Sequence, residues 1–110
     1  MKDGDYVMSV IWHTNAFRGD KFEEAWRPAA EAVLRYGATE WLFMRSIDDH
    51  LDFVQYAVFP GGKSDFERYW YSEEISEARA EASGLYEVPI LPVWFRVVEA
   101  GEVATTEVEA

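Results

Sequence analysis

The sequence predicts an α+β domain in which strands and helices follow one another in the order βαββαβ. Two observations support this prediction. Short segments rich in β-branched and aromatic residues alternate with two longer amphipathic segments, and Gly, Pro, Asn or Asp residues separate them. Two right-handed βαβ-type halves of this length give a four-stranded antiparallel sheet with both helices on one face. We expect this single domain to cover residues 1–99.

Four short segments are predicted to be strands because apolar and polar side chains alternate along them and β-branched residues are frequent. They are Tyr6–Asn15, Thr39–Ile47, Leu51–Phe59 and Val93–Glu99. The acidic turn at 48–50 joins the second and third strands as a hairpin. Pro89 and Pro92 frame an extended linker before the last strand.

The first amphipathic segment has apolar residues at helical spacing and is predicted to be a helix. It should begin at a capping box formed by Asp20 and Glu23 and end at Gly37. Because Pro28 removes one backbone hydrogen bond, we expect the helix to break near 26–28.

The second helix is expected to begin at another capping box, Ser64 with Glu67, and to end at Gly84. Its apolar phase slips near Ser72, and the acidic Glu73 directly afterwards suits a new helix N-terminus. We therefore expect this helix to be interrupted at Ser72.

Composition limits both the size of the core and the class of ligand. Of 110 residues, 49% are apolar and 16% aromatic, which is more bulky hydrophobic material than a small monomer easily buries. The net charge of −11 at pH 7 repels phosphate backbones and anionic lipids, so we expect neither nucleic acid nor membrane as a partner. Without cysteine, the chain has no disulfide and no thiolate metal site.

The two ends of the sequence carry no predicted packed element. The start, MKDGDYVMS, lacks a basic region followed by an apolar stretch. No run approaches the roughly 20 apolar residues that span a bilayer, so we expect a cytoplasmic protein. Residues 100–110 contain three acids and neither basic nor aromatic residues, which predicts a flexible acidic tail.

Alternation along the strands assigns side chains to the two faces of the sheet. The face expected under the helices is apolar and consists of Met8, Val10, Trp12, Leu42, Met44, Val54, Tyr56, Val58, Val93, Phe95 and Val97. The other face mixes aromatic and polar residues and consists of Ser9, Ile11, His13, Trp41, Phe43, Arg45, Phe53, Gln55, Ala57, Trp94 and Arg96. We expect this mixed face to be a half-enclosed pocket or a subunit interface.

The element order, the second-helix sequence FERYW followed by SEEISEAR, and the closing PVWFRVVE strand resemble the dimeric α+β barrel superfamily. The resemblance is greatest to its antibiotic-biosynthesis-monooxygenase branch and covers roughly residues 6–99. It implies a ferredoxin-like fold in which two subunits place their sheets face to face as a barrel. It also implies a pocket between sheet and helices in each subunit.

Proteins of this superfamily include cofactor-independent oxygenases of aromatic polyketides or quinols, haem-degrading enzymes and proteins without known activity. The haem-degrading members ligate iron through a His on the second helix, where this chain has Ala78 and Arg79. Haem degradation is therefore disfavoured, and the cofactor-independent oxygenases that the chain resembles imply neither metal nor flavin. The run of Asp48, Asp49, His50 and Asp52 does not predict a metal site either, because a hairpin turn spreads such residues in different directions.

Three residues of the mixed face are candidates for catalysis. A neutral imidazole at His13 could accept a proton from a phenol or quinol near neutral pH. The interpretation favoured over this one is a structural polar residue at a strand end, because no orienting carboxylate is near it in the sequence. Arg45 and Arg96 could stabilise a substrate anion through their guanidinium donors. Alternatively, they form salt bridges across a dimer.

Four further residues are candidates for the wall of a substrate pocket, namely Trp12, Asn15, Tyr69 and Trp70. The aromatic members could hold a flat ligand or could form part of the core. The leading hypothesis is a homodimer that binds a small aromatic ligand and acts as a cofactor-independent monooxygenase. The alternative is a non-catalytic dimer in which the partner subunit fills the sheet face.

Overall fold

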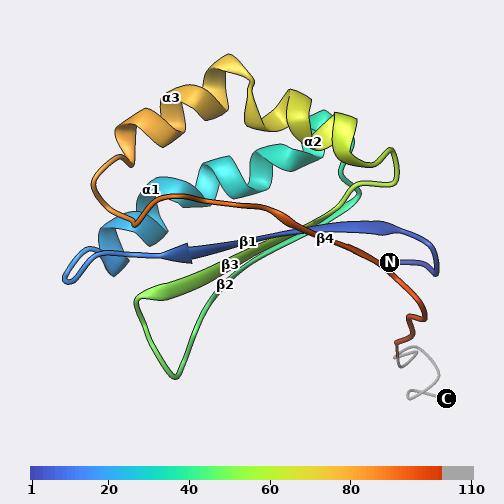
Figure 1. Ribbon diagram of the computed structural model, residues 1–110, viewed down its shortest axis with the longest axis horizontal. Coiled ribbons are helices and arrows are strands. Elements are labelled where there is room, and N and C mark those ends of the chain that lie inside the picture. The colour runs from blue at the N-terminus through green and yellow to red at the C-terminus, as the bar shows by residue number, and fades with distance from the viewer. Residues whose placement is uncertain (103–110) are drawn as a thin grey trace, which may run out of the picture.

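The computed structural model describes residues 1–102 as a four-stranded antiparallel sheet with helices on one face (Figure 1). The strands lie in the order β2-β3-β1-β4 and comprise β1 (Tyr6–His13), β2 (Glu40–Arg45), β3 (Asp52–Val58) and β4 (Val93–Arg96). The helices are α1 (Gly19–Glu31), the short 3₁₀ helix η1 (Ala32–Tyr36), α2 (Lys63–Trp70) and α3 (Glu73–Glu81). The ferredoxin-like βαββαβ prediction is therefore confirmed.

Most of the acidic tail predicted at 100–110 lies outside the described residues, namely residues 103–110. Within residues 1–102, no helix combines the length and the apolar character needed to cross a membrane.

The break predicted in the first helix is wrong in position. Helix α1 continues through Pro28 to Glu31, where the chain tightens into η1. Pro28 lacks an N–H donor but keeps its carbonyl, which accepts a hydrogen bond from the N–H of Ala32. As predicted, Gly37 ends this stretch, and its φ of 100° places it in the left-handed region that favours glycine.

Both predicted capping boxes are wrong. Helix α1 begins at Gly19 and α2 at Lys63, and neither N-terminus has a side-chain cap. Instead, the carboxylates of Asp20 and Glu23 accept hydrogen bonds from the guanidinium of Arg45.

The predicted interruption of the second helix at Ser72 is confirmed. Ser72 is the N-cap of α3, and its hydroxyl oxygen accepts a hydrogen bond from the N–H of Ile75 over 3.3 Å. Glu73 and Glu74 occupy the first turn, where negative charge is favourable. Helix α3 ends at Glu81, short of Gly84.

The face assignment from the sequence is wrong for three of the four strands. Strand β1 places Met8, Val10 and Trp12 under the helices as expected, but Met8 lies opposite both Ala57 and Trp94. Residues opposite each other share a face, so the face under the helices also holds Trp41, Phe43, Arg45, Phe53, Gln55, Ala57, Trp94 and Arg96.

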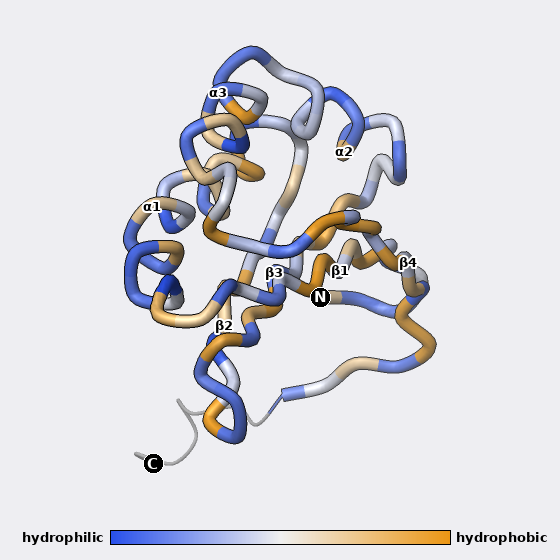
Figure 2. The backbone as a smooth tube through the Cα atoms, turned by 60° about the vertical axis from the view of Figure 1, so that its left-hand side comes forward, coloured by the Kyte–Doolittle hydropathy of each residue, from blue (hydrophilic) through white to orange (hydrophobic). Residues whose placement is uncertain are grey.

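On the other face of the sheet, the open face, no helix of residues 1–102 packs (Figure 1). It consists of Val7, Ser9, Ile11, His13, Glu40, Leu42, Met44, Asp52, Val54, Tyr56, Val58, Val93 and Phe95. Several of these hydrophobic side chains are strongly exposed, with Leu42 at 53% and Phe95 at 55%. The hydrophobic stretches along the sheet are visible as orange segments in Figure 2.

The core lies between the sheet and the helices and is dominated by aromatic rings. Trp12 packs against Phe22, Trp26 and Trp70, with ring centroids 4.7 to 6.0 Å apart. At its centre, the fully buried Gln55 accepts a hydrogen bond from the indole N–H of Trp26 at 3.0 Å. The side-chain amide of Gln55 donates in turn to the hydroxyl of Tyr69, again at 3.0 Å.

Candidate functional site

His13 and Asp52 form an imidazole–carboxylate pair on the open face. His13 ends β1, Asp52 begins β3, and the antiparallel register places the two residues directly opposite each other. His13 Nδ1 lies 2.7 Å from Asp52 Oδ1. Because an ionised carboxylate only accepts hydrogen bonds, Nδ1 carries the proton and Nε2 of the neutral ring carries a free lone pair.

The electrostatic surroundings make His13 more basic than a free histidine. The hydrogen bond from His13 to the carboxylate of Asp52 raises the pKa of His13 and is the largest influence on it. Partial burial opposes this shift, whereas the charges of Asp52, Glu87 and Asp49 add to it, so the pKa is raised on balance. The imidazole stays accessible, because 57% of the side chain is exposed. The pair therefore provides an oriented base that is open to a small molecule.

An apolar floor adjoins this pair on the open face. Ile11 precedes His13 by two residues on β1, and Val54 of β3 lies opposite Ile11. Met44 of the edge strand β2 lies opposite Val54. Since Ile11 and Met44 are 47% and 40% exposed, a flat apolar molecule could rest on these side chains with its polar group at His13.

Arg45 lies on the other face of the sheet and is fully engaged within the chain. Its guanidinium donates to Asp20 at 2.8 Å, to Glu23 at 3.2 Å and to the backbone carbonyl of His50 at 2.6 Å. The hydrogen bond to Asp20 raises the pKa of Arg45 further. The salt bridges expected for Arg45 therefore form within one chain.

Arg96 lies far from His13, because it is paired with Tyr6 at the opposite end of β1. It lines a shallow hollow of about 420 Å³ together with Tyr6, Lys63 and Trp94. No Asp or Glu of residues 1–102 lies within salt-bridge distance of it. Arg45 and Arg96 thus do not converge on one substrate position.

The residues predicted to wall a pocket lie inside the core. Trp12 and Tyr69 are fully buried, and Trp70 is nearly so. Tyr69 donates to the backbone carbonyl of Ala29 at 2.7 Å, and burial raises its pKa well above the usual value. Asn15 donates to the carbonyl of Gly84 at 2.8 Å and so fastens the segment after α3.

The structure therefore separates the predicted site into parts. Trp12 and His13 are neighbours along β1 and point to opposite faces of the sheet. A ligand on the apolar floor can reach His13, whereas a ligand between sheet and helices would meet Trp12 and Trp70.

Two residues that sequence reasoning missed stand out in the structure. Asp52 fell within the third predicted strand without a role, and only the register between β1 and β3 places it opposite His13 at the end of β1. Arg79 of α3 was noted only for occupying the place of a histidine. Its guanidinium stacks on the ring of Trp70, with Cζ 4.5 Å from the centroid. No sequence signal identifies this contact, because it depends on how α2 and α3 are angled.

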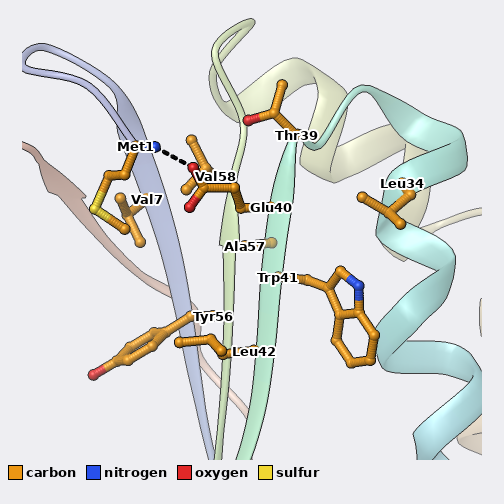
Figure 3. A pocket seen from close by; sticks show the side chains of 10 residues that line it. All are labelled: Met1, Val7, Leu34, Thr39, Glu40, Trp41, Leu42, Tyr56, Ala57 and Val58. Carbon is orange, nitrogen blue, oxygen red and sulfur yellow. Dashed lines mark hydrogen bonds and ion pairs between the residues drawn. The ribbon is translucent and has the colours of Figure 1, made fainter. Parts of the chain in front are cut away.

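An apolar pocket of about 460 Å³ lies beside the edge strand β2 (Figure 3). Its lining includes Leu34 of η1, Trp41 and Leu42 of β2 and Tyr56 of β3. Figure 3 also shows the carboxylate of Glu40 paired with the amino group of Met1. The pocket contains none of the predicted site residues and lies at the end of the sheet away from His13.

Comparison with known proteins identifies the fold. No protein-family model matches the sequence, and a search of curated proteins gave no significant match. Several solved structures match closely in three dimensions. A provisionally assigned antibiotic biosynthesis monooxygenase from Nitrosomonas europaea is 22% identical, with a TM-score of 0.72 over 82% of this chain and 95% of that one.

Two further structures give the same result. SnoaB from Streptomyces nogalater, a cofactor-independent oxygenase, is 19% identical, with a TM-score of 0.67 over 92% of this chain and 98% of its own. A Bordetella bronchiseptica protein with the same provisional monooxygenase assignment is 15% identical, with a TM-score of 0.74 over 87% and 99% of the two chains. The chain therefore has the fold of the antibiotic-biosynthesis-monooxygenase-like proteins.

Proposed function

We propose that this chain is a homodimeric, small-molecule-binding protein that acts as a cofactor-independent monooxygenase on a phenolic or polyketide-like aromatic substrate. The observation that carries the proposal is the His13–Asp52 pair, in which Asp52 fixes the proton on Nδ1 and leaves Nε2 as a base. The solved structures with the same fold support it, because SnoaB is described as a cofactor-independent oxygenase.

The composition of the open face supports the proposed homodimer. Among the acidic residues of the described chain, 1–102, only Glu40 and Asp52 lie on the strands of this face, and both stand at strand ends. The middle of the face carries exposed side chains such as Ile11 and Leu42. A second copy offers an equally apolar surface whose middle carries no charged side chain, so face-to-face pairing would remove both from water and leave Glu40 and Asp52 at the strand ends. It would also cover the floor beside His13.

In the proposed reaction, His13 Nε2 takes the proton of a substrate hydroxyl group. The resulting electron-rich anion is oxidised by molecular oxygen. One oxygen atom forms a new bond to the substrate carbon in place of hydrogen, and the other leaves as water, so that a phenol becomes a quinone. The chain contributes the base, holds the anion and excludes water. Arg45 acts as a positioning residue. Its guanidinium donates to the backbone carbonyl of His50 and so holds in place the hairpin turn that precedes Asp52.

The experiment measures oxygen consumption with a panel of quinols and polyketide-like phenols. His13→Ala should lower the rate about 100-fold or more, because general-base catalysis usually contributes at least that factor. His50→Ala is the matched control, since this histidine is exposed in the hairpin turn and should leave the rate unchanged. Equal rates for wild type and His13→Ala would refute the role of His13.

The pH profile tests the role of Asp52. Only neutral His13 can accept a proton, so the rate should rise with pH through the pKa of His13, which Asp52 holds above 6.5. In Asp52→Asn the negative partner is gone, and the midpoint of this rise should move to lower pH. An unchanged midpoint would show that Asp52 does not tune the base.

A non-catalytic dimer is the second candidate, and the packed aromatic core favours it. The rings around Trp12 fill the space between sheet and helices, and Trp12 and Phe22 are fully buried. In this case the dimer forms, but no member of the panel raises the melting temperature or consumes oxygen.

A further inference from the structure

The base proposed at His13 lies between two carboxylate residues. On one side, Asp52 of β3 is opposite His13, and its Oδ1 lies 2.7 Å from His13 Nδ1. On the other side of β1, the N–H of Glu87 donates to the carbonyl of His13 at 2.8 Å. Thr14 and Tyr86 form an antiparallel bridge. Their neighbours, His13 and Glu87, are therefore opposite each other and point to the same side of the sheet.

Side-chain packing supports this placement of Glu87, which belongs to the segment between α3 and β4, outside the strands of the open face. The ring of Tyr86 packs against the buried Trp12, which lies under the helices. Because side chains alternate along paired segments, Glu87 points away from the helices, as His13 does after Trp12. Glu87 is exposed and forms no salt bridge within residues 1–102. Its charge can therefore act on a molecule bound at His13.

The charges that act most strongly on this base are negative. The hydrogen bond to Asp52 raises the pKa of His13 most, partial burial opposes it, and the charges of Asp52, Glu87 and Asp49 raise it further. Asp49 is held in the hairpin turn, where its backbone carbonyl accepts from the N–H of Asp52 at 2.9 Å. Three carboxylates therefore lie around one imidazole, and 57% of that side chain is exposed.

The positive charges that could balance a substrate anion lie elsewhere. Arg45 is on the face under the helices, where two carboxylates hold it, and Arg96 is at the opposite end of β1. Among residues 1–102, the strand residues of the open face include neither Lys nor Arg, so a second copy paired through this face brings none either. Once His13 has taken a phenol proton, its imidazolium is shared between Asp52 and the substrate oxyanion. The charge of Glu87 then remains unbalanced.

We propose that the site at His13 takes phenols that carry an ammonium group, and that Glu87 binds this group while His13 takes the phenol proton. This inference rests on the function proposed above and specifies its substrate class. The ammonium group balances the charge of Glu87, and after the hydroxyl proton has moved to Nε2 the substrate is a zwitterion without net charge. A phenol with a carboxylate side chain would instead meet Glu87 and Asp49 with like charge, which disfavours its binding.

The test compares the binding of three phenols of similar size at neutral pH. Tyramine carries an ammonium group on its side chain, tyrosol a hydroxyl and phloretate a carboxylate. Binding is followed by NMR through the imidazole signals of His13, which His50→Ala assigns because the chain has only two histidines. At low salt, tyramine should bind about tenfold or more tightly than phloretate, with tyrosol between them. High salt should reduce the difference, because it screens exposed charges.

Substitutions at Glu87 test its part in this preference. Glu87→Gln should reduce the preference for tyramine over phloretate about two- to tenfold, because one attraction and one repulsion are both lost. Glu87→Asp keeps the charge and should keep most of the preference. Glu67→Gln is the matched control, since Glu67 is exposed on α2 and its substitution makes the same change in net charge.

Affinity and oxygen consumption are separate readouts. Lack of turnover alone would refute the proposed reaction, whereas a wrong order of affinities would refute the charge preference. The proposal is overturned if phloretate binds as tightly as tyramine, or if Glu87→Gln leaves the preference unchanged. It is also overturned if none of the three phenols binds at millimolar concentration, or if tyramine binds without moving the His13 signals.

Discussion

At the scale of single residues, Gln55 shows how a polar side chain becomes part of a core. It is fully buried on β3, yet its carbonyl accepts from Trp26 and its amide donates to Tyr69. The hydroxyl of Tyr69 donates in turn to the backbone carbonyl of Ala29 in α1. The network thereby ties the sheet to both α1 and α2, and each buried polar group in it has a partner.

Gln55→Leu is predicted to lower the free energy of unfolding by about 1–3 kcal/mol, because the indole N–H of Trp26 is left buried without an acceptor. Urea unfolding followed by circular dichroism measures the change. In a Gln55→Leu background, Trp26→Phe should cost less than it does in the wild type, since the unpaired donor is then removed. Additive effects of the two substitutions would contradict this account.

Sequence reasoning identified part of the candidate site at this scale. His13 was selected for its chemistry, and the structure supplies the carboxylate that orients it. Asp52 was overlooked because it lies 39 positions further along the chain and only strand register joins the two. Arg79 could not be found, because its contact with the ring of Trp70 depends on how α2 and α3 are angled.

At the scale of elements, helix starts were predicted with uneven success. Ser64 with Glu67 and Ser72 with Glu74 both have residue types that suit a helix N-terminus, yet only Ser72 caps a helix. The chain enters α2 through Gly62 at a φ of 84°, so the helix begins one residue before Ser64. Whether a serine caps a helix depends on the backbone conformation of the residues before the helix. The four-residue pattern of a capping box does not contain this information.

Ser72→Ala is predicted to destabilise the protein by about 1 kcal/mol, the usual cost of removing an N-cap hydroxyl. Ser64→Ala is the matched control, because this serine lies inside α2 without a capping bond and should change stability by less than about 0.5 kcal/mol. Thermal and urea unfolding of both variants provide the comparison. Equal losses for the two would mean that Ser72 does not act as a cap.

The faces of the strands were the hardest element-level feature to predict. Within the hairpin the parity was right, since Arg45 and Phe53 lie opposite each other and share a face. The error arose in joining the hairpin to β1, because Leu42 and Trp41 are both apolar and either could face the core. A sheet with hydrophobic residues on both faces gives alternation without indicating which face the helices cover.

At the scale of the whole molecule, the fold was predictable because element order and topology rules leave few arrangements. The same sheet explains the surplus of hydrophobic residues noted in the composition. Helices cover one face, while the open face retains exposed aliphatic and aromatic side chains (Figure 1). A second copy would match this face, because the middle of the face is apolar and Glu40 and Asp52 stand at strand ends.

Ile11→Arg is predicted to convert a dimer into a monomer, because it places a charge at the centre of the open face without a partner. Ile47→Arg is the matched control. Ile47 is 99% exposed in the turn after β2, away from the open face, and its substitution should leave the dimer intact. Size-exclusion chromatography with light scattering distinguishes the two outcomes.

Sedimentation equilibrium of the wild-type protein tests pairing through the open face most directly. The predicted result is a species of twice the 12.7 kDa chain mass at micromolar concentration, which dissociates when Ile11 is replaced by Arg. A wild-type protein that sediments as a single chain up to millimolar concentration would contradict the account. The apolar floor beside His13 would then be open to water, and water would not be excluded from the reaction proposed there.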